Sequence, residues 1–259
     1  MTSTTLDLKN APGHQVLAAA GKKILRPGGR AATEQLFEWA NFQPGETVLE
    51  LASSFGYSAI ALAQQYGVRV VGVEKNPSSV ARARENVAIA GLTNQIEIIE
   101  GDILQLQQIS GSFDYVLAEA ILTMQPAIAK AKILSGIASR LKPGGTFLAH
   151  ELLASNQQEK IHRDLAQAIR VNATPLSDTE WISTIEASGL KVIRYSTGAM
   201  SLLQIPHLIQ DEGIITTIQI LWNVLTHPQI RQRVLAMRRT FQRYSQDLGY
   251  IIFSAQRNS

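Results

Sequence analysis

The chain has 259 residues, of which 45% are hydrophobic and 17% are charged, with a formal net charge of +3 and no cysteine. A chain of this length and composition can bury a sizeable core, and it is far from the profile of a disordered protein. The composition excludes disulfides, thiolate zinc sites and cysteine nucleophiles, and the small net charge gives no argument for nucleic-acid binding.

The predicted elements begin with two helices, at 13–25 and 30–39. From residue 46 to residue 151, short β-branched runs alternate with longer helical stretches. We expect strands at 46–51, 69–74, 96–100, 114–119 and 145–151, joined by helices at 57–66, 78–90 and 127–141. The nearly continuous apolar runs are typical of strands that helices cover on both faces. The pattern predicts an α/β fold with βαβ units and a Rossmann-like, doubly wound parallel sheet.

Two short segments mark where helices of this region begin and end. Asn76-Pro77-Ser78-Ser79 predicts a helix start, in which the proline ends the strand and a serine caps the helix. Lys142-Pro143-Gly144-Gly145 predicts a helix stop, in which the glycines permit the turn into the next strand.

The C-terminal part is predicted to be mainly helical. We expect helices at 156–171 and 178–188, a strand near 190–196, a helical block at 202–247 and a final strand at 250–255. In the last helix of the block, an apolar face is formed by Ile230, Val234, Met237, Phe241 and Tyr244. The arginines of that helix favour a solvated opposite face, and the alternative is a basic lip that attracts an anionic substrate or a membrane surface.

These elements indicate one domain over residues 1–259. Residues 1–40 would supply N-terminal helices that act as a lid, residues 41–151 the cofactor-binding core, and residues 202–247 a helical cap inserted before the last strand. The alternative for the apolar surface of the insertion is a homodimer interface.

A strand, a loop of small residues and a helix start follow one another from Val48 to Ala63 (VLELASSFGYSAIALA). Such a turn lets the backbone approach a ligand closely. Glu74 ends the second strand, where a carboxylate can accept hydrogen bonds from both hydroxyls of a ribose. Asp102 follows the third strand, where it can bind the amine of adenine or, alternatively, cap the short helix after it.

These segments, together with LRPGG at 25–29, FDYVLAEA at 113–120 and LKPGG at 141–145, resemble the class I S-adenosylmethionine-dependent methyltransferases. The resemblance covers about residues 25–190 and is closest to the small-molecule branch around the ubiquinone and menaquinone C-methyltransferases. It implies a seven-stranded sheet whose last strand is antiparallel. It also implies that S-adenosylmethionine binds at the carboxyl ends of the first two strands.

The resemblance assigns roles to individual residues. Glu50 corresponds to the acid that holds the methionine amino group, Glu74 to the ribose-binding acid, and Asp102 with Ile103 to the adenine-binding pair. Ala52 and Ser54 stand where the family has glycines, and their side chains fit if the backbone there avoids positive φ. The full set of expected cofactor-binding residues is Glu50, Ala52, Ser54, Gly56, Glu74, Lys75, Asp102, Ile103 and Ala118.

Methyl transfer from a sulfonium is an in-line displacement, which positioning and the exclusion of water accelerate. A base is required only when the acceptor must lose a proton. The candidate catalytic residues are His150 and Glu119, at the ends of the fifth and fourth strands. His150 and Glu151 point to opposite faces of their strand, and a hydrogen-bonded structural role is the alternative for His150.

We expect a small-molecule acceptor, and Trp181, Met124 and Met200 favour an apolar or aromatic one. DNA is not expected as a substrate, because the segment 119–122 lacks the Asn/Asp-Pro-Pro-aromatic tetrad of amino-methylating nucleic-acid enzymes. No metal is expected, because the five histidines show no ligand spacing. A lid would contain the helix around His14, together with Met200 and Trp222.

Two other functions remain open on the sequence. One is a protein that binds S-adenosylmethionine without catalysis, which the missing loop glycines suggest. The other is an NAD-dependent oxidoreductase, although the loop lacks the G-x-G-x-x-G fingerprint. No signal peptide is visible, and the most apolar stretch, 214–225, is too short and polar to span a bilayer. We therefore expect a cytoplasmic protein without a transmembrane segment.

Overall fold

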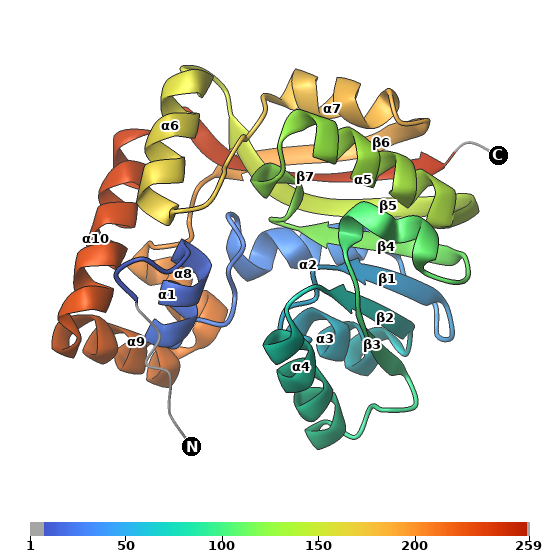
Figure 1. Cartoon of the computed structure of the whole chain (residues 1–259), viewed down its shortest axis with the longest axis horizontal. Coiled ribbons are helices and arrows are strands. Elements are labelled where there is room, and N and C mark those ends of the chain that lie inside the picture. The colour runs from blue at the N-terminus through green and yellow to red at the C-terminus, as the bar shows by residue number, and fades with distance from the viewer. Residues whose placement is uncertain (1–7, 258–259) are drawn as a thin grey trace.

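The computed structural model describes residues 8–257, so the first seven residues of the expected N-terminal segment lie outside the described residues. A seven-stranded sheet with the order β3-β2-β1-β4-β5-β7-β6 forms its centre (Figure 1). Neighbouring strands from β3 to β5 are parallel, and β7 runs antiparallel to both of its neighbours. This confirms the expected doubly wound sheet with an antiparallel last strand. The strands are β1 (Thr47–Leu51), β2 (Arg69–Glu74), β3 (Ile96–Glu100), β4 (Phe113–Glu119), β5 (Leu141–Ala154), β6 (Leu190–Ala199) and β7 (Leu248–Arg257).

Helices cover both faces of the sheet, because successive apolar residues of the central strands point to opposite sides. Val48 belongs to one buried cluster and the next residue, Leu49, to another. The first cluster lies under α2 (Gly29–Ala40), α3 (Tyr57–Tyr66) and α4 (Pro77–Ile89). The second lies under α5 (Ala127–Arg140), α7 (Asp178–Glu186) and the 3₁₀ helix η1 (Ile103–Gln108), and a second 3₁₀ helix, η2 (Leu122–Met124), precedes α5.

Five further helices gather at one end of the sheet (Figure 1), and all of them except α8 (Ile205–Glu212) contribute to a third apolar cluster. They are α1 (Gly13–Ala20), α6 (Gln158–Ile169), α8 (Ile205–Glu212), α9 (Ile214–Thr226) and α10 (Pro228–Arg243). On α10 the expected apolar face is buried, with Ile230 and Met237 3% and 1% exposed. Among the described residues, no helix combines the length and the apolar character that crossing a membrane requires.

The helix expected at 13–25 is too long by five residues. It ends at Ala20 because Gly21 adopts a φ of +105°, from which its N–H bonds back to the last turn. The chain then continues without helical structure, and the N–H groups of Lys23 and Ile24 donate to Glu212 at 2.9 and 2.8 Å. Glu212 follows about 190 residues later in the sequence, so local patterns gave no sign of this contact.

Two expected boundaries also differ from the structure. Asn76, rather than a serine, caps α4, since its side chain accepts hydrogen bonds from the N–H groups of Ser78 and Ser79. Strand β5 begins at Leu141 instead of residue 145, because a register shift lets Leu141 pair with Phe113 ahead of the main ladder. Gly144, with a φ of +74°, permits this irregular start.

Candidate functional site

The loop between β1 and α3 turns tightly through three left-handed residues. Ala52, Ser54 and Gly56 have φ values of +52°, +50° and +76°. The backbone at Ala52 and Ser54 therefore does not avoid positive φ, which was the condition for their side chains to fit without strain. An L-residue in the left-handed conformation destabilises the fold by about 1–2 kcal/mol. The loop is held by hydrogen bonds from Ser53 N to Val73 O at 3.0 Å and from Ser54 N to Glu74 Oε2 at 2.9 Å.

This loop walls a cavity of about 120 Å³, which we call the polar cavity. The cavity lies at the carboxyl ends of β1 and β4, where the strand order reverses and ligands bind in open α/β sheets. Its lining comes from the loop, the start of α3, the end of β4, helix α1 and the segment after it. The lining residues are Ala18, Lys22, Lys23, Leu25, Arg26, Glu50, Leu51, Ala52, Ser54, Phe55, Tyr57, Ser58 and Glu119.

Glu50 places an incompletely satisfied carboxyl group at this cavity. The residue is 5% exposed, and its Oε2 has no hydrogen-bond partner among residues 8–257. Burial, followed by the neighbouring charge of Glu119, raises the pKa of Glu50 from 4.5 to about 8, against smaller lowering effects of Ser58 and Arg26. A buried carboxyl with an unused oxygen is a ready partner for a cationic ligand group.

Glu119 is the centre of a polar cluster at the end of β4. Arg26 Nε lies 2.7 Å from Oε1, which also accepts from Thr33 Oγ1 at 2.8 Å. Oε2 accepts from Ser58 Oγ at 3.0 Å, and Ser58 in turn contacts the guanidinium of Arg26. Both oxygens are thus engaged by groups from three separate segments, which the cluster ties together.

His150 contacts this cluster through Thr33 and does not line the polar cavity. The residue is fully buried, and Nε2 accepts a hydrogen bond from Gly28 N at 3.0 Å. The proton therefore sits on Nδ1, which lies 3.1 Å from Thr33 Oγ1, and Thr33 donates to Glu119. Burial, with a smaller effect of Arg26, lowers the pKa of His150 to about 3. A neutral imidazole with both nitrogens bonded supports the cluster rather than exchanging protons with a ligand.

Glu151 points to the opposite face of β5, as the alternation along a strand predicts. Its carboxylate accepts hydrogen bonds from the N–H groups of Ile121, Leu122 and Thr123 and from Thr123 Oγ1. Burial raises the pKa of Glu151 to about 6. Glu151 fixes the turn after β4 and does not line the polar cavity.

The expected ribose and adenine carboxylates lie at the ends of β2 and β3, outside the lining of the polar cavity. Glu74 accepts from Ser54 N and, through Oε1, from Asn76 N at 2.8 Å. Asp102 binds Lys75 Nζ at 2.8 Å and caps η1 through Leu104 N, and the bond to Lys75 is the main cause of its lowered pKa. Ile103 begins η1 beside Asp102, while Ala118 is buried in register with Leu51. Of the expected cofactor residues, the polar cavity therefore gathers Glu50, Ala52 and Ser54.

A second cavity, of about 70 Å³, lies beyond the turn that follows Glu119 and is walled almost entirely by apolar side chains. We call it the apolar cavity. Leu25 lines both cavities, and the single titratable side chain in the apolar wall is His14, whose pKa burial lowers. The other lining residues are Gly13, Leu17, Pro27, Ala120, Met124, Leu152, Leu165, Ile169, Val171, Met200, Leu202, Met237 and Phe241.

Only some of the side chains that the sequence suggested for binding an acceptor line the apolar cavity. Met124 and Met200 line the apolar cavity. Trp181 belongs to α7, is buried in the core, and donates its indole N–H to Leu152 O at 2.9 Å. Trp222 points to solvent and is 66% exposed. Sequence reasoning missed Arg26 and Ser58, although the LRPGG segment that contains Arg26 was the available signal.

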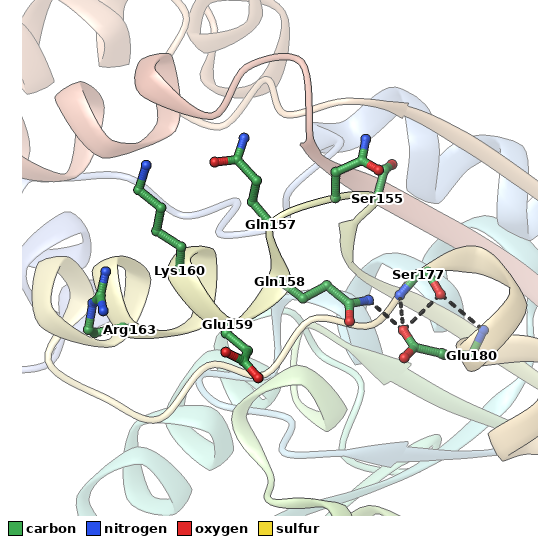
Figure 2. A pocket seen from close by; sticks show the side chains of 9 residues that line it. Ser155, Gln157, Gln158, Glu159, Lys160, Arg163, Ser177 and Glu180 are labelled. Atoms are coloured by element: carbon green, nitrogen blue, oxygen red, sulfur yellow. Dashed lines mark hydrogen bonds between the residues drawn. The ribbon is translucent and has the colours of Figure 1, made fainter.

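Another surface hollow lies away from these strand ends, between the start of α6 and the start of α7. Figure 2 shows that three of its polar residues turn toward one another, since Gln158 and Ser177 both bond to Glu180. The bonds between Ser177 and Glu180 form the capping box of α7. These groups stabilise helix ends and leave the polar cavity as the better candidate. Within residues 8–257, no three His, Asp or Glu side chains lie where they could hold a metal ion.

Comparisons with known proteins show what the chain is similar to. Residues 48–145 match the family described as "Methyltransferase domain". Over 250 residues the chain is 34% identical to an uncharacterized protein of Haemophilus influenzae, a match that covers 96% of this chain and 99% of that protein. It is 28% identical over 157 residues to a sterol 24-C-methyltransferase of Gibberella zeae, which covers 58% of this chain but 41% of that enzyme.

A solved structure shows the same fold over nearly the whole chain. A SAM-dependent methyltransferase from Thiobacillus denitrificans, crystallised in complex with S-adenosyl-L-homocysteine, has a TM-score of 0.69 and 16% sequence identity to this chain. The match covers 95% of this chain and 98% of that structure. The helical cap is therefore part of what the two folds share.

Proposed function

We propose that this chain is a class I S-adenosylmethionine-dependent methyltransferase and that it transfers the methyl group of this cofactor to a small apolar acceptor. The observation that carries the proposal is the pair of neighbouring cavities. One is polar and lies at the ends of β1 and β4, the other is apolar, and Leu25 lines both. A nucleophile in the apolar cavity would approach a methyl group presented from the polar one.

The residues at the strand ends fit the cofactor, which when bound supplies a methyl group on a positively charged sulfur. The unused Oε2 of Glu50 suits the amino group of the methionine portion, and the small side chains of Ala52 and Ser54 leave room beside it. Glu74 accepts two N–H bonds, and a carboxylate has further lone pairs for ribose hydroxyls. In this proposal Asp102, with Lys75 and Ile103, meets the adenine, and the backbones of Gly56 and Ala118 flank the ligand.

On the acceptor side, the chain supplies position and a dry environment. Helix α1 and the cap act as the lid, which keeps water from the reacting centre. Where the acceptor must lose a proton, His14 is the better placed base, because it is the titratable side chain that lines the apolar cavity. Glu119 and His150 then position Arg26 and the loop after α1. The closer resemblance to quinone C-methyltransferases and the cytoplasmic location stay predictions.

The test is a screen of small apolar acceptors with S-adenosylmethionine, read by mass spectrometry for a methylated product and for S-adenosylhomocysteine. Val171→Phe, which reduces the apolar cavity, should lower kcat/KM for the acceptor and leave the cofactor Kd unchanged. Val224→Phe, which packs against the same apolar cluster as Val171 but lies outside the cavity lining, is the matched control. Tight cofactor binding without any product across the screen would favour the alternative of a binding protein that transfers nothing.

A further inference from the structure

Helix α9 carries an apolar stripe on its exposed face. Ile215, Ile218 and Trp222 are 76%, 61% and 66% exposed. At about 100° per residue, the stripe spans about a third of the helix circumference, and no residue of α9 is charged. The stripe consists of Ile214, Ile215, Ile218, Leu221, Trp222 and Leu225. A contiguous apolar face of this kind marks an interaction surface rather than a solvated helix.

The acidic side chains near the stripe are withdrawn from the surface. Between residues 201 and 246 the acids are Asp211 and Glu212, and their side chains are 3% and 2% exposed. Asp211 lies 3.3 Å from Lys22 Nζ, and Glu212 lies 3.5 Å from the same atom. Neither carboxylate therefore contributes negative charge to the face that α9 presents.

Helix α10, which follows α9, carries five arginines and no acid. Arg233 is buried, and its guanidinium donates hydrogen bonds to backbone carbonyls. This corrects the expectation that all five arginines are solvated. Arg243 forms an ion pair with Asp164. The side chains of the remaining three arginines make no hydrogen bond or ion pair within residues 8–257, and these arginines are Arg231, Arg238 and Arg239. Helix α10 packs against α9, so uncompensated positive charge lies on the helix next to the one that carries the apolar stripe.

The inner side of α9 packs on the helix that walls both cavities. Asn223 Nδ2 donates to Ala20 O at 3.1 Å, at the end of α1. From α1, Leu17 lines the apolar cavity and Ala18 the polar one. A surface that engages the stripe would therefore lie one helix away from the proposed acceptor cavity.

We propose that the stripe on α9 docks on the surface of an anionic lipid bilayer, with Trp222 and the isoleucines in the interface and the arginines of α10 toward the headgroups. The charge distribution favours lipid over a second copy of the chain. A twofold contact brings the same patch together with itself, so the uncompensated arginines would face one another. Anionic headgroups would neutralise them instead. The inference does not depend on methyl transfer.

The test is sedimentation of the full chain with vesicles of phosphatidylcholine alone and of phosphatidylcholine with one third phosphatidylglycerol. We expect binding to the anionic vesicles that weakens at high ionic strength. Ile215→Gln/Ile218→Gln/Trp222→Gln should lower the partition coefficient about tenfold or more. Arg231→Gln/Arg239→Gln should lower it about fivefold for each charge removed. Because all five side chains are exposed, circular dichroism should show an unchanged fold.

The matched control is Ile89→Gln/Ile128→Gln, which removes equally exposed isoleucines from α4 and α5, away from the cap. This control should bind vesicles like the wild type. Three results would each overturn the proposal: no binding of the wild type to anionic vesicles, an equal loss in the control, or a stripe variant that only converts a dimer to a monomer in sedimentation velocity. The last result would assign the stripe to a second copy.

Discussion

Replacing Glu50 with glutamine tests whether this carboxyl is held protonated for a cationic ligand. Burial raises its pKa from 4.5 to about 8, so the folded chain binds a proton that the unfolded chain releases. Between these two values the unfolded state binds fewer protons than the folded state, so the free energy of unfolding falls as the pH rises. Glutamine keeps the shape of the protonated acid and carries no such dependence.

The size of the effect follows from the two pKa values. Integrating the difference in proton binding from about pH 5 to about pH 8 gives on the order of 3 kcal/mol of stability that the wild type loses and Glu50→Gln retains. Urea unfolding of both proteins across this range measures the difference, and other titrating groups cancel in the comparison. A wild-type-minus-variant difference that stays constant with pH would refute the buried, protonated state of Glu50.

The proton on the Glu50 carboxyl should be released when a cationic ligand binds. At pH 7 a carboxyl with a pKa of about 8 is about 90% protonated, and an ammonium group placed against it favours the carboxylate. Binding of S-adenosylhomocysteine should therefore release about 0.9 proton per site, measured by calorimetry in buffers of different ionisation enthalpy. The Glu50→Gln variant should bind more weakly and release none. Equal proton release by both proteins would show that the amino group binds elsewhere.

Three further changes give independent tests. Ser54→Gly should raise the unfolding free energy by about 0.5–1 kcal/mol in urea titrations, because glycine relieves a left-handed φ, whereas Ser78→Gly in a regular helical turn should lower it. His14→Gln should remove the acidic limb of a pH–kcat profile if the acceptor loses a proton, and an unchanged profile would remove His14 from the mechanism. Lys22→Met should destabilise the fold by about 3–5 kcal/mol, since it leaves Asp211 buried without its cation, and Lys22→Met/Asp211→Asn should recover part of that loss.

The sheet could be predicted from the sequence because its signals are local. Strands such as Arg69–Glu74 and Ile96–Glu100 coincide with the expected runs, since burial on both faces leaves nearly continuous apolar residues. The end of α1 was missed because the expected helix was continued through Gly21, although a glycine commonly ends a helix in the left-handed conformation. The early start of β5 depends on pairing with β4, which a single segment does not reveal.

The part of the candidate site that lies on one continuous segment could also be predicted, because its signals are local. Glu50, Ala52 and Ser54 stand on one continuous strand and loop, and they do line the polar cavity. His150 was a reasonable base from its place at a strand end, but its partner Gly28 lies 122 residues earlier in the chain and encloses the ring. Arg26 meets Glu119 over a similarly long separation, so the cluster emerges only when the chain is folded.

The central claim, that the polar cavity holds the methionine portion of S-adenosylmethionine, is tested most directly by calorimetric titration of Ser54→Trp. The indole would fill a cavity of about 120 Å³, and Ser135→Trp, on an exposed turn of α5, is the matched control. We expect the control to bind S-adenosylmethionine like the wild type and Ser54→Trp to bind none. Unchanged affinity in a folded Ser54→Trp protein would contradict the assignment of the cavity.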